Sequence, residues 1–414
     1  MKEVHLSTSF RIFAYMNNTT AYLNSNDGSS ILALGEKDRI RISGKDSLEG
    51  LEAFLSRNQG SYRFGLLSYD LKEALHGLNS NNPDLIHAPH ATFWVPECVV
   101  RMDHENFEFL YGEKDETTLE LISEILEEET NTNYHQHLFR FEPSVKKEDY
   151  LKTVLQLKAH IQRGDIYEIN YCQEFVAKDV ELTNVWDTYF KLNHLTKAPH
   201  SAFVQVDEFA LFCGSPERFL RKKGTRLISE PIKGTARRSE NSEEDLKLKE
   251  KLRNDPKERS ENIMIVDLVR NDLSRVAQKG SVEVEELCGI YTFETVHQMI
   301  STIACELRPE LPLSEILAAT FPMGSMTGAP KRRAMELIEE YENFQRGLYS
   351  GSVGYIDPAG DFDFNVVIRS LLYNSEQKVL SCAVGSAITI QSEPEREYDE
   401  CMVKIKRIMD GINE

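Results

Sequence analysis

The stretch LYSGSVGYIDPAGDFDFNVVIRSLLYNSEQKVLSCAVGSAITI, from Leu348 to Ile390, decides the fold class of this chain. It contains three apolar runs with the composition of strands, LYSGSVGYI, DFNVVIRSLLY and KVLSCAVGSAITI. The connections between them, DPAGD and NSEQ, are too short for a crossover helix, so the strands are predicted to be antiparallel. We therefore expect an α+β protein with antiparallel β-sheets and peripheral helices.

Helical signals surround these strands. Ser144 is the expected N-cap of a helix that ends at Gly164. A long helical region covers roughly 243–277 and is interrupted near Pro256. The last helix is expected to begin at Ser392. These helical signals all lie in the last two thirds of the chain.

The chain divides at an acidic, polar stretch, LEEETNTNYHQH (126–137), which is predicted to be a surface connection. We assign residues 1–140 to a strand-rich N-terminal part of the fold, in which RFGLLSYDL (63–71) has the pattern of a buried strand. The region 145–410 holds nearly all the motifs that suggest chemistry, so the site is expected there.

Composition argues against several classes of function. The net charge of the 414 residues is −19, and no run of Lys and Arg is large enough for a nucleic-acid surface. We see no secretory leader and no apolar span of about 18 residues, and expect neither secretion nor membrane insertion. The seven cysteines are scattered without a C-x-x-C pair, which is typical of reduced thiols in a cytoplasmic protein. Because an acidic surface repels anions, an anionic substrate would have to be held by local cations.

Two predicted helices each present a pair of carboxylates on one face. Glu258 and Glu261 are three residues apart, as are Glu397 and Glu400, and Lys404 lies one turn past Glu400. Two such pairs facing each other would repel unless a cation lay between them, and oxygen ligands suit magnesium. Taken alone, either pair is more commonly a solvated helix face.

Four other features suggest a site. The glycine-rich loop FPMGSMTGAPK (321–331) opens a helix whose free amides favour an anion, although a plain loop-to-helix junction is as good an interpretation. Arg369 lies in an apolar strand and needs a partner, either a bidentate carboxylate or a structural salt bridge. His297 is either an active-site or a core histidine. Glu217, in GSPERFL, could act as a general acid or base.

Taken together, the motifs resemble those of a known family. SPERFL, PIKGTARR, ENIMIVDLVRNDLSRV, FPMGSMTGAPKRRAMELIEE, RGLYSGSVGYI, VVIRS and SEPEREYDECMVK follow one another in the order found in the chorismate-utilising enzymes. That family includes component I of anthranilate synthase and of aminodeoxychorismate synthase, and the isochorismate and salicylate synthases. The resemblance is dense over residues 145–410 and looser before them.

The resemblance implies chorismate as substrate, magnesium as cofactor, and one α+β fold of two packed antiparallel β-sheets with outer helices. It implies that Glu261 and Glu400 hold the magnesium, with Glu258 and Glu397 close by. It assigns further residues to the substrate or the reaction: Tyr349 and Arg369 at the enolpyruvyl carboxylate with amides near Gly385, Thr235 beside the ring, His297 as the active-site histidine, and Lys404 on the carboxylate side. GSA (385–387) departs from the family, in which many members have a second glycine.

Two positions distinguish the branches of the family. The isochorismate and salicylate enzymes resemble one another in carrying a water-activating lysine at the position of Glu168. Asn170 is similar to the residue found in the branch that aminates carbon 4. Lys233 in PIKGT is the signature of that branch, where other members usually have alanine. The implied product is 4-amino-4-deoxychorismate, on the route to para-aminobenzoate and folate.

The resemblance also implies covalent catalysis by Lys233. Its amine would add at ring carbon 2 while the 4-hydroxyl leaves with a proton from Glu217, and ammonia would then attack carbon 4 and expel the lysine. An apolar setting such as that of Ile232 would keep the amine partly deprotonated.

Other interpretations stay open. The chain could be an anthranilate synthase component I, or a non-catalytic homologue that only binds a metabolite or partner. Ammonia is expected from a separate glutamine amidotransferase subunit, because none of the seven cysteines lies in a tight G-x-C-x-G turn.

Overall fold

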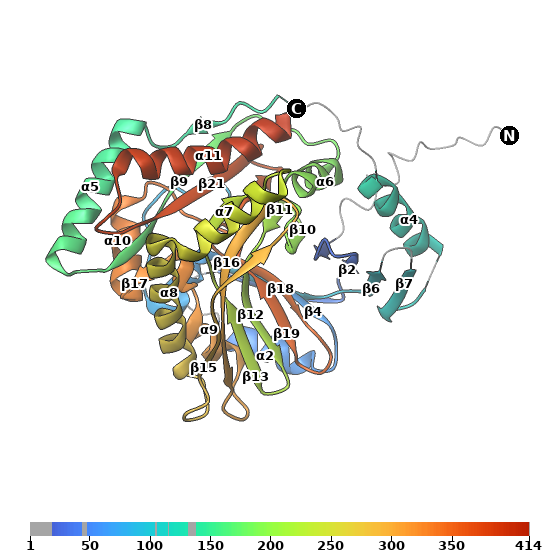
Figure 1. The fold of residues 1–414 in the computed structure, drawn as a ribbon. Helices are drawn as coiled ribbons and strands as arrows, with labels where there is room; N and C mark the ends of the chain where they lie inside the picture. The colour runs from blue at the N-terminus through green and yellow to red at the C-terminus, as the bar shows by residue number, and fades with distance from the viewer. Residues whose placement is uncertain (1–18, 44–47, 104–105, 115, 131–137, 414) are drawn as a thin grey trace.

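Two large antiparallel β-sheets form the centre of the protein in a computed structural model, which describes residues 19–43, 48–103, 106–114, 116–130 and 138–413 (Figure 1). Every strand pairing found in these residues is antiparallel, as the short connections after Ile356 and Asn374 predict. Helices cover the outer faces, so the predicted α+β class is confirmed. Among the described residues, no helix is both long and apolar enough to span a bilayer.

The first sheet combines strands from both ends of the chain. In spatial order it contains β17 (Gly328–Ala329), β9 (Glu168–Ala177), β21 (Val379–Ile388), β20 (Ser370–Asn374), β11 (Phe209–Ser215), β10 (His200–Val206), β1 (Thr20–Asn24), β2 (Ser29–Leu34), β6 (Cys98–Asp103) and β7 (Asn106–Tyr111). The short β8 (Glu142–Pro143) pairs with β9. Because β1 pairs with β10, the N-terminal part shares this sheet with the rest of the chain.

The second sheet is built in the same way. Its order is β14 (Ile232–Arg237), β16 (Val296–Glu306), β13 (Arg226–Glu230), β12 (Arg218–Lys223), β19 (Phe362–Asn365), β18 (Ser352–Ile356), β4 (Arg63–Leu67), β5 (Ala91–Val95) and β3 (Asp38–Ile42). β15 (Glu283–Thr292) pairs with β16. The predicted buried strand in RFGLLSYDL is β4, whose residues are all buried.

Two of the places where the chain crosses from one sheet to the other are neighbours in space. DFNVVIRSLLY was predicted as one strand, but it divides into β19 in the second sheet and β20 in the first. Arg369 lies at this break with a positive φ of 51°. Pro216 and Glu217 form the other crossing, between β11 and β12. A backbone bond of 3.0 Å from the Val366 N–H to the Glu217 carbonyl joins the two crossings.

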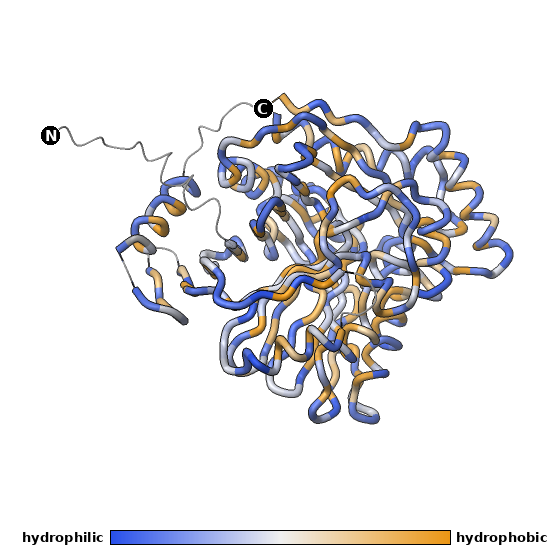
Figure 2. The backbone as a smooth tube through the Cα atoms, turned by 180° about the vertical axis from the view of Figure 1, so that it is seen from behind, coloured by the Kyte–Doolittle hydropathy of each residue, from blue (hydrophilic) through white to orange (hydrophobic). Residues whose placement is uncertain are grey.

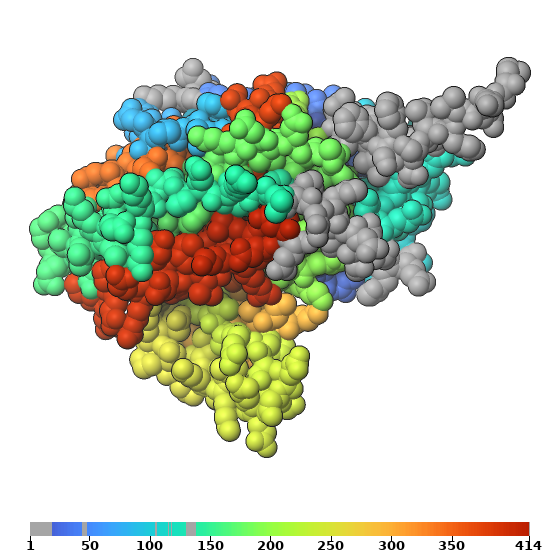
Figure 3. Space-filling view, turned by 90° about the horizontal axis from the view of Figure 1, so that it is seen from above, coloured from blue at the N-terminus to red at the C-terminus, as the bar shows by residue number. Residues whose placement is uncertain are grey.

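Helices lie on the outer faces of both sheets. They are α2 (Leu48–Arg57), α3 (Lys72–His76), α4 (Glu116–Thr130), α5 (Lys147–Arg163), α6 (Val185–Thr196), α7 (Ser242–Asn254), α8 (Pro256–Ser274), α9 (Leu313–Thr320), α10 (Lys331–Tyr341) and α11 (Pro394–Asn413), with short turns η1 (Tyr69–Leu71) and η2 (Gly324–Met326). α5, α6, α10 and α11 pack on the first sheet, and α7 and α8 on the second. Seen from above, α11 lies between α5 and the segment of α7 and α8 (Figure 3).

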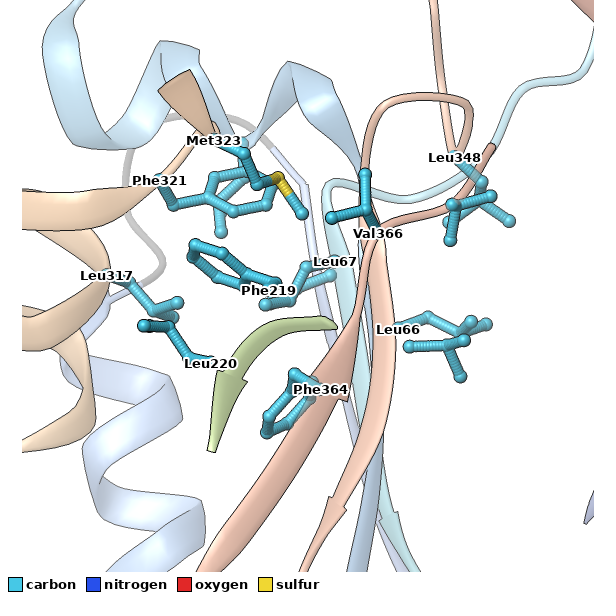
Figure 4. Close-up of a cluster of buried hydrophobic side chains, with 14 of the residues drawn as sticks. Leu66, Leu67, Phe219, Leu220, Leu317, Phe321, Met323, Leu348, Phe364 and Val366 are labelled. Carbon is cyan, nitrogen blue, oxygen red and sulfur yellow. The ribbon is translucent and has the colours of Figure 1, made fainter. Parts of the chain in front are cut away.

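Two apolar cores hold these layers together. The first contains residues of both sheets and of α2, α8 and α9, and the second contains residues of the first sheet and its helices. In the first core, Phe219 lies beside Phe321, with a ring-centroid distance of 5.9 Å, and beside Met323 (Figure 4). The outer helices alternate between hydrophobic and hydrophilic segments, as expected for helices with one buried face (Figure 2). The first core anchors the chain just after Glu217.

Several local predictions need correction. The N-cap of α5 is Lys146 rather than Ser144, although Gly164 ends the helix in a left-handed conformation as predicted. The predicted surface connection 126–137 begins inside α4, and residues 131–137 lie outside the described residues. α11 begins at Pro394, because the Ser392 hydroxyl accepts a bond from a backbone N–H before the helix. The break near Pro256 separates α7 from α8 as predicted.

Candidate active site

A cavity of about 490 Å³ opens where the two sheet crossings meet α8 and α11. Every site residue predicted from the sequence lines it except His297: Asn170, Glu217, Lys233, Thr235, Glu258, Glu261, Tyr349, Arg369, Gly385, Glu397, Glu400 and Lys404. These residues come from segments that are far apart in the sequence. The fold therefore brings the predicted cluster together at one place.

A larger cavity of about 670 Å³ lies nearby but has a different chemistry. Its lining, which includes Asn26, His194 and Tyr291, contains none of the predicted site residues. The two cavities share Pro216 and Ile232. We take the smaller cavity as the candidate active site because the predicted site residues other than His297 line it.

A bulge in β14 directs Lys233 into the cavity. The pairing of β14 with β16 shifts register between Ile232 and Thr235, and Gly234 adopts a φ of 93°. A side chain on Gly234 would be strained and would approach a carboxylate oxygen of Glu258 at 3.1 Å. The glycine after the lysine is therefore required by the backbone.

The Lys233 amine forms an ion pair with a residue whose role the sequence did not indicate. Its Nζ lies 2.9 Å from Oε1 of Glu168, and both side chains are largely buried. Burial lowers the pKa of Lys233, but the carboxylates of Glu168 and Glu261 outweigh burial and raise that pKa above its ordinary value. The prediction of a partly deprotonated amine in an apolar setting is therefore wrong, because the setting is acidic and favours the ammonium form.

Glu217 lies at the β11–β12 crossing with its carboxyl group fully enclosed. Its Oε1 accepts a hydrogen bond of 2.7 Å from the Ser325 hydroxyl, and its backbone N–H donates to Ser215. Burial raises the pKa of Glu217 to about 7, against the lowering influence of Ser325 and Lys233. A carboxyl group with this pKa exchanges protons near neutral pH, which suits a general acid or base.

The glycine-rich loop FPMGSMTGAPK contributes side chains to the site. Ser325 and Met326, in η2, line the cavity. The N-terminus of α10 does not line it, and Lys331 at the start of that helix forms an ion pair with Asp272. The predicted anion site at the free amides of this helix is therefore not part of the cavity.

The four predicted metal-site carboxylates lie on α8 and α11. Asp255 caps α8 by accepting bonds from the N–H groups of Lys257 and Glu258, which fixes the start of the helix. Lys257 Nζ then lies 3.7 Å from Oε1 of Glu261 and 3.5 Å from Oε1 of Glu397, so it links the two helices. The sequence analysis did not identify Lys257.

These carboxylates fit a divalent cation by their chemistry, although they do not yet converge. Apart from the Lys257 ammonium at 3.7 Å, Oε1 of Glu261 is buried with no hydrogen bond in the described part of the chain, and burial raises the pKa of Glu261 to about 7. Glu400 pairs with Lys404 at 2.7 Å. In the described part of the chain, no three His, Cys, Asp or Glu side chains are arranged to hold a metal ion. An orphaned oxygen among several carboxylates matches the oxygen ligands of magnesium.

Arg369 and its neighbours form the opposite wall. No ion pair or side-chain hydrogen bond of Arg369 occurs among the described residues, so the alternative of a structural salt bridge is not present there. Its guanidinium is therefore available to a ligand. Gly385 allows β9 to approach, because a side chain there would lie 2.4 Å from Oδ1 of Asn170. Tyr349 is buried beside them.

His297 does not line the cavity. Its Nε2 lies 3.0 Å from Asp245 and its Nδ1 lies 3.0 Å from Thr292, in the interior below α7. Alternate residues of a strand face opposite sides, so the next residue of β16, Gln298, faces the cavity instead. Both polar atoms of the Gln298 amide are buried with no partner among the described residues, which makes Gln298 a candidate site residue that no sequence motif indicated.

Comparison with known proteins gives consistent matches. A family model described as chorismate binding enzyme matches residues 14–410. The chain is 36% identical to aminodeoxychorismate synthase component 1 of Klebsiella aerogenes over 83% of its own length and 76% of that protein. It is 39% identical to the Escherichia coli K12 protein of the same name over 65% of its length, and this match spans 58% of that protein. The crystal structure of anthranilate synthase component I from Streptococcus pneumoniae superposes with a TM-score of 0.78 at 26% identity, covering 92% of each chain.

Proposed function

The chain belongs to the family of chorismate binding enzymes, and from this premise we propose that it converts chorismate and ammonia into 4-amino-4-deoxychorismate, for para-aminobenzoate and folate synthesis. Three bacterial relatives named aminodeoxychorismate synthase component 1 are 36 to 40% identical to it over the aligned regions. The observation that carries the proposal is Lys233, which lines the cavity together with Glu217 and pairs with Glu168 at 2.9 Å.

The cavity has the cations that a dianion requires. Within the described ranges the Arg369 side chain has no ion pair or hydrogen bond, and it suits one carboxylate of chorismate, with Tyr349 in the same cavity lining. Lys404 and Lys257 line the other side. We propose that Glu261 and Glu400 hold magnesium, with Glu258 and Glu397 as outer ligands: Mg²⁺ would neutralise the ring carboxylate when bound.

In the proposed reaction the lysine is the nucleophile and a carboxyl group protonates the leaving group. The neutral amine of Lys233 attacks ring carbon 2, and Glu217 gives its proton to the departing 4-hydroxyl. Ammonia then attacks carbon 4 and displaces the lysine. Asn170 and Thr235, which line the cavity, would contact the ring, and Gly385 would offer a backbone amide.

Two further proposals concern the cellular setting. We propose that a separate glutamine amidotransferase subunit supplies ammonia, since the chain has no cysteine in a G-x-C-x-G turn. We also propose a cytoplasmic location, which the seven free, buried cysteines support.

The test is a product assay with chorismate, magnesium chloride and ammonium chloride. The expected product retains the enolpyruvyl group and carries an amine at carbon 4. Release of pyruvate with formation of anthranilate would instead favour an anthranilate synthase. No conversion under any of these conditions would favour a homologue that only binds a ligand.

A further inference from the structure

We propose that Glu168 is a second catalytic carboxylate, which accepts a proton from Lys233 as the amine attacks the substrate. The inference rests on the proposed function, because it assigns a partner to the lysine nucleophile. It adds a residue in direct contact with the reacting nitrogen atom, at 2.9 Å. Glu168 begins β9, two residues before Asn170 on the same side of the strand.

The geometry around Glu168 is that of a proton acceptor with spare capacity. Oε1 accepts a hydrogen bond from the Lys233 ammonium, and Oε2 is buried with no hydrogen-bond partner among the residues that the structure describes. The side chain of Glu168 is 2% exposed and that of Lys233 is 11% exposed, so bulk water has little access to the pair. A carboxylate that needs only to hold a charge would ordinarily have both oxygens satisfied.

The chemistry requires two proton carriers. Glu217 must begin the reaction protonated if it is to protonate the 4-hydroxyl, so it cannot also take the lysine proton. The other acids that influence Lys233 are Glu258 and Glu261 on α8 and Glu400 on α11, which are the proposed metal ligands. Glu168 is the carboxylate that forms an ion pair with Lys233 in the described part of the chain.

The protons and bonds balance over one cycle. A proton moves from Lys233 Nζ to Glu168, and the amine lone pair then bonds to carbon 2 while the conjugated ring double bonds shift. The carbon 4–oxygen bond breaks, and the oxygen leaves as water with the proton of Glu217. Ammonia bonds to carbon 4, the double bonds shift back, and Lys233 leaves as a neutral amine. The new ammonium group returns a proton to Glu217, and Glu168 returns its proton to Lys233.

A purely structural ion pair would have a different consequence. A buried salt bridge between Glu168 and Lys233 could simply offset two charges, and its loss would then lower activity equally at all pH values. If Glu168 accepts the proton, transfer within the pair leaves the total number of bound protons unchanged. The turnover rate of the wild-type enzyme then does not depend on pH through this pair. Without Glu168, the proton of Lys233 must go to solvent, so the turnover rate of the variant rises with pH.

The experiment compares Glu168→Gln with wild type from about pH 6 to about pH 8, using ammonium-dependent turnover. The ratio of the variant kcat to the wild-type kcat cancels the titration of Glu217. We expect a loss on the order of a hundredfold at about pH 7, with the ratio rising about tenfold per pH unit. A ratio that stays constant with pH, or turnover equal to wild type, overturns the proposal.

A matched control lies on the same strand. Glu174 is also buried in β9, and its Oε1 accepts a bond of 2.6 Å from Ser381, away from the cavity. Glu174→Gln is expected to keep the wild-type pH profile. If circular dichroism shows that Glu168→Gln does not fold, Glu168→Asp replaces it. This variant keeps a carboxylate, so it should be slower than wild type at a kcat ratio that does not change with pH. A ratio that rises with pH would contradict the proposal.

The same experiment distinguishes this inference from the proposed function. Lys233→Ala is assayed in parallel under identical conditions. If Lys233→Ala keeps turnover, the nucleophile assignment fails, and the role of Glu168 fails with it. If Lys233→Ala is inactive while Glu168→Gln shows a pH-independent ratio, only the inference about Glu168 fails.

Discussion

Replacing Glu217 with glutamine should make the folded protein more stable above neutral pH while removing the proposed chemistry. Glutamine has the shape of a protonated glutamic acid and can still accept the bond that Ser325 donates at 2.7 Å. The wild-type carboxyl group is enclosed, and burial raises its pKa from 4.5 to about 7. The native site therefore favours the neutral form that glutamine imitates.

The magnitude follows from linkage. Between pH 4.5 and about 7 the unfolded chain loses the Glu217 proton while the folded chain keeps it. The wild-type free energy of unfolding therefore falls as pH rises through this window, by about 1.4 kcal/mol per pH unit and about 3 kcal/mol in total. Glutamine does not titrate, so the free energy of unfolding of the variant does not fall in this window. It therefore exceeds the wild-type value above about pH 7 and equals it below about pH 4.5.

The assay is urea-induced unfolding of both proteins at about pH 5 and about pH 8. The stability advantage of Glu217→Gln is expected to grow by a few kcal/mol between these pH values. Glu340→Gln, at an exposed position on α10, should change stability by about 0.5 kcal/mol or less at both. The reasoning is refuted if Glu217→Gln is no more stable than wild type at the higher pH.

Three other outcomes follow from the site and its surroundings. Glu261→Gln or Glu400→Gln should abolish activity with circular dichroism unchanged, and full wild-type activity in excess chelator would contradict the magnesium proposal. The purified chain should use ammonium salts but not glutamine, which a coupled glutamate assay would detect; glutamine-dependent turnover would show that no amidotransferase subunit is needed. Arg346→Met should lower the free energy of unfolding by about 3–5 kcal/mol, because it leaves Glu342, 2.6 Å from the guanidinium, buried without its charge partner. A decrease below about 1 kcal/mol in urea unfolding would refute that assignment.

The antiparallel direction of the consecutive C-terminal strands was predictable from the sequence, and the resemblance to the family pointed to many of the cavity residues. Short connections allow only antiparallel neighbours, so the order of β20 and β21 follows from NSEQ alone. The division of DFNVVIRSLLY between two sheets was not predictable, because both halves are apolar and only the backbone at Arg369 marks the break. Its positive φ is a tertiary feature without a local signal.

The errors within the site have a common physical origin. Periodicity and motifs place a residue on an element, but they do not show which face of a strand meets a cavity. His297 and Gln298 are adjacent, and the register of β16 alone decides which of them faces the site. In the same way, the acidic surroundings of Lys233 arise from Glu168 on a strand of the other sheet. The local sequence around Ile232 could not reveal them.

The most direct test of the account is mass spectrometry of wild-type enzyme quenched after mixing with chorismate and magnesium, first without and then with ammonium. We expect an adduct of chorismate less water on the peptide that contains Lys233, and its loss when ammonium is added. Lys233→Arg, which keeps the charge but not the nucleophilic amine, should carry no adduct and turn over on the order of hundreds of times more slowly. An unmodified wild-type chain together with near-normal turnover of Lys233→Arg would contradict covalent catalysis and leave Lys233 as a charge contact.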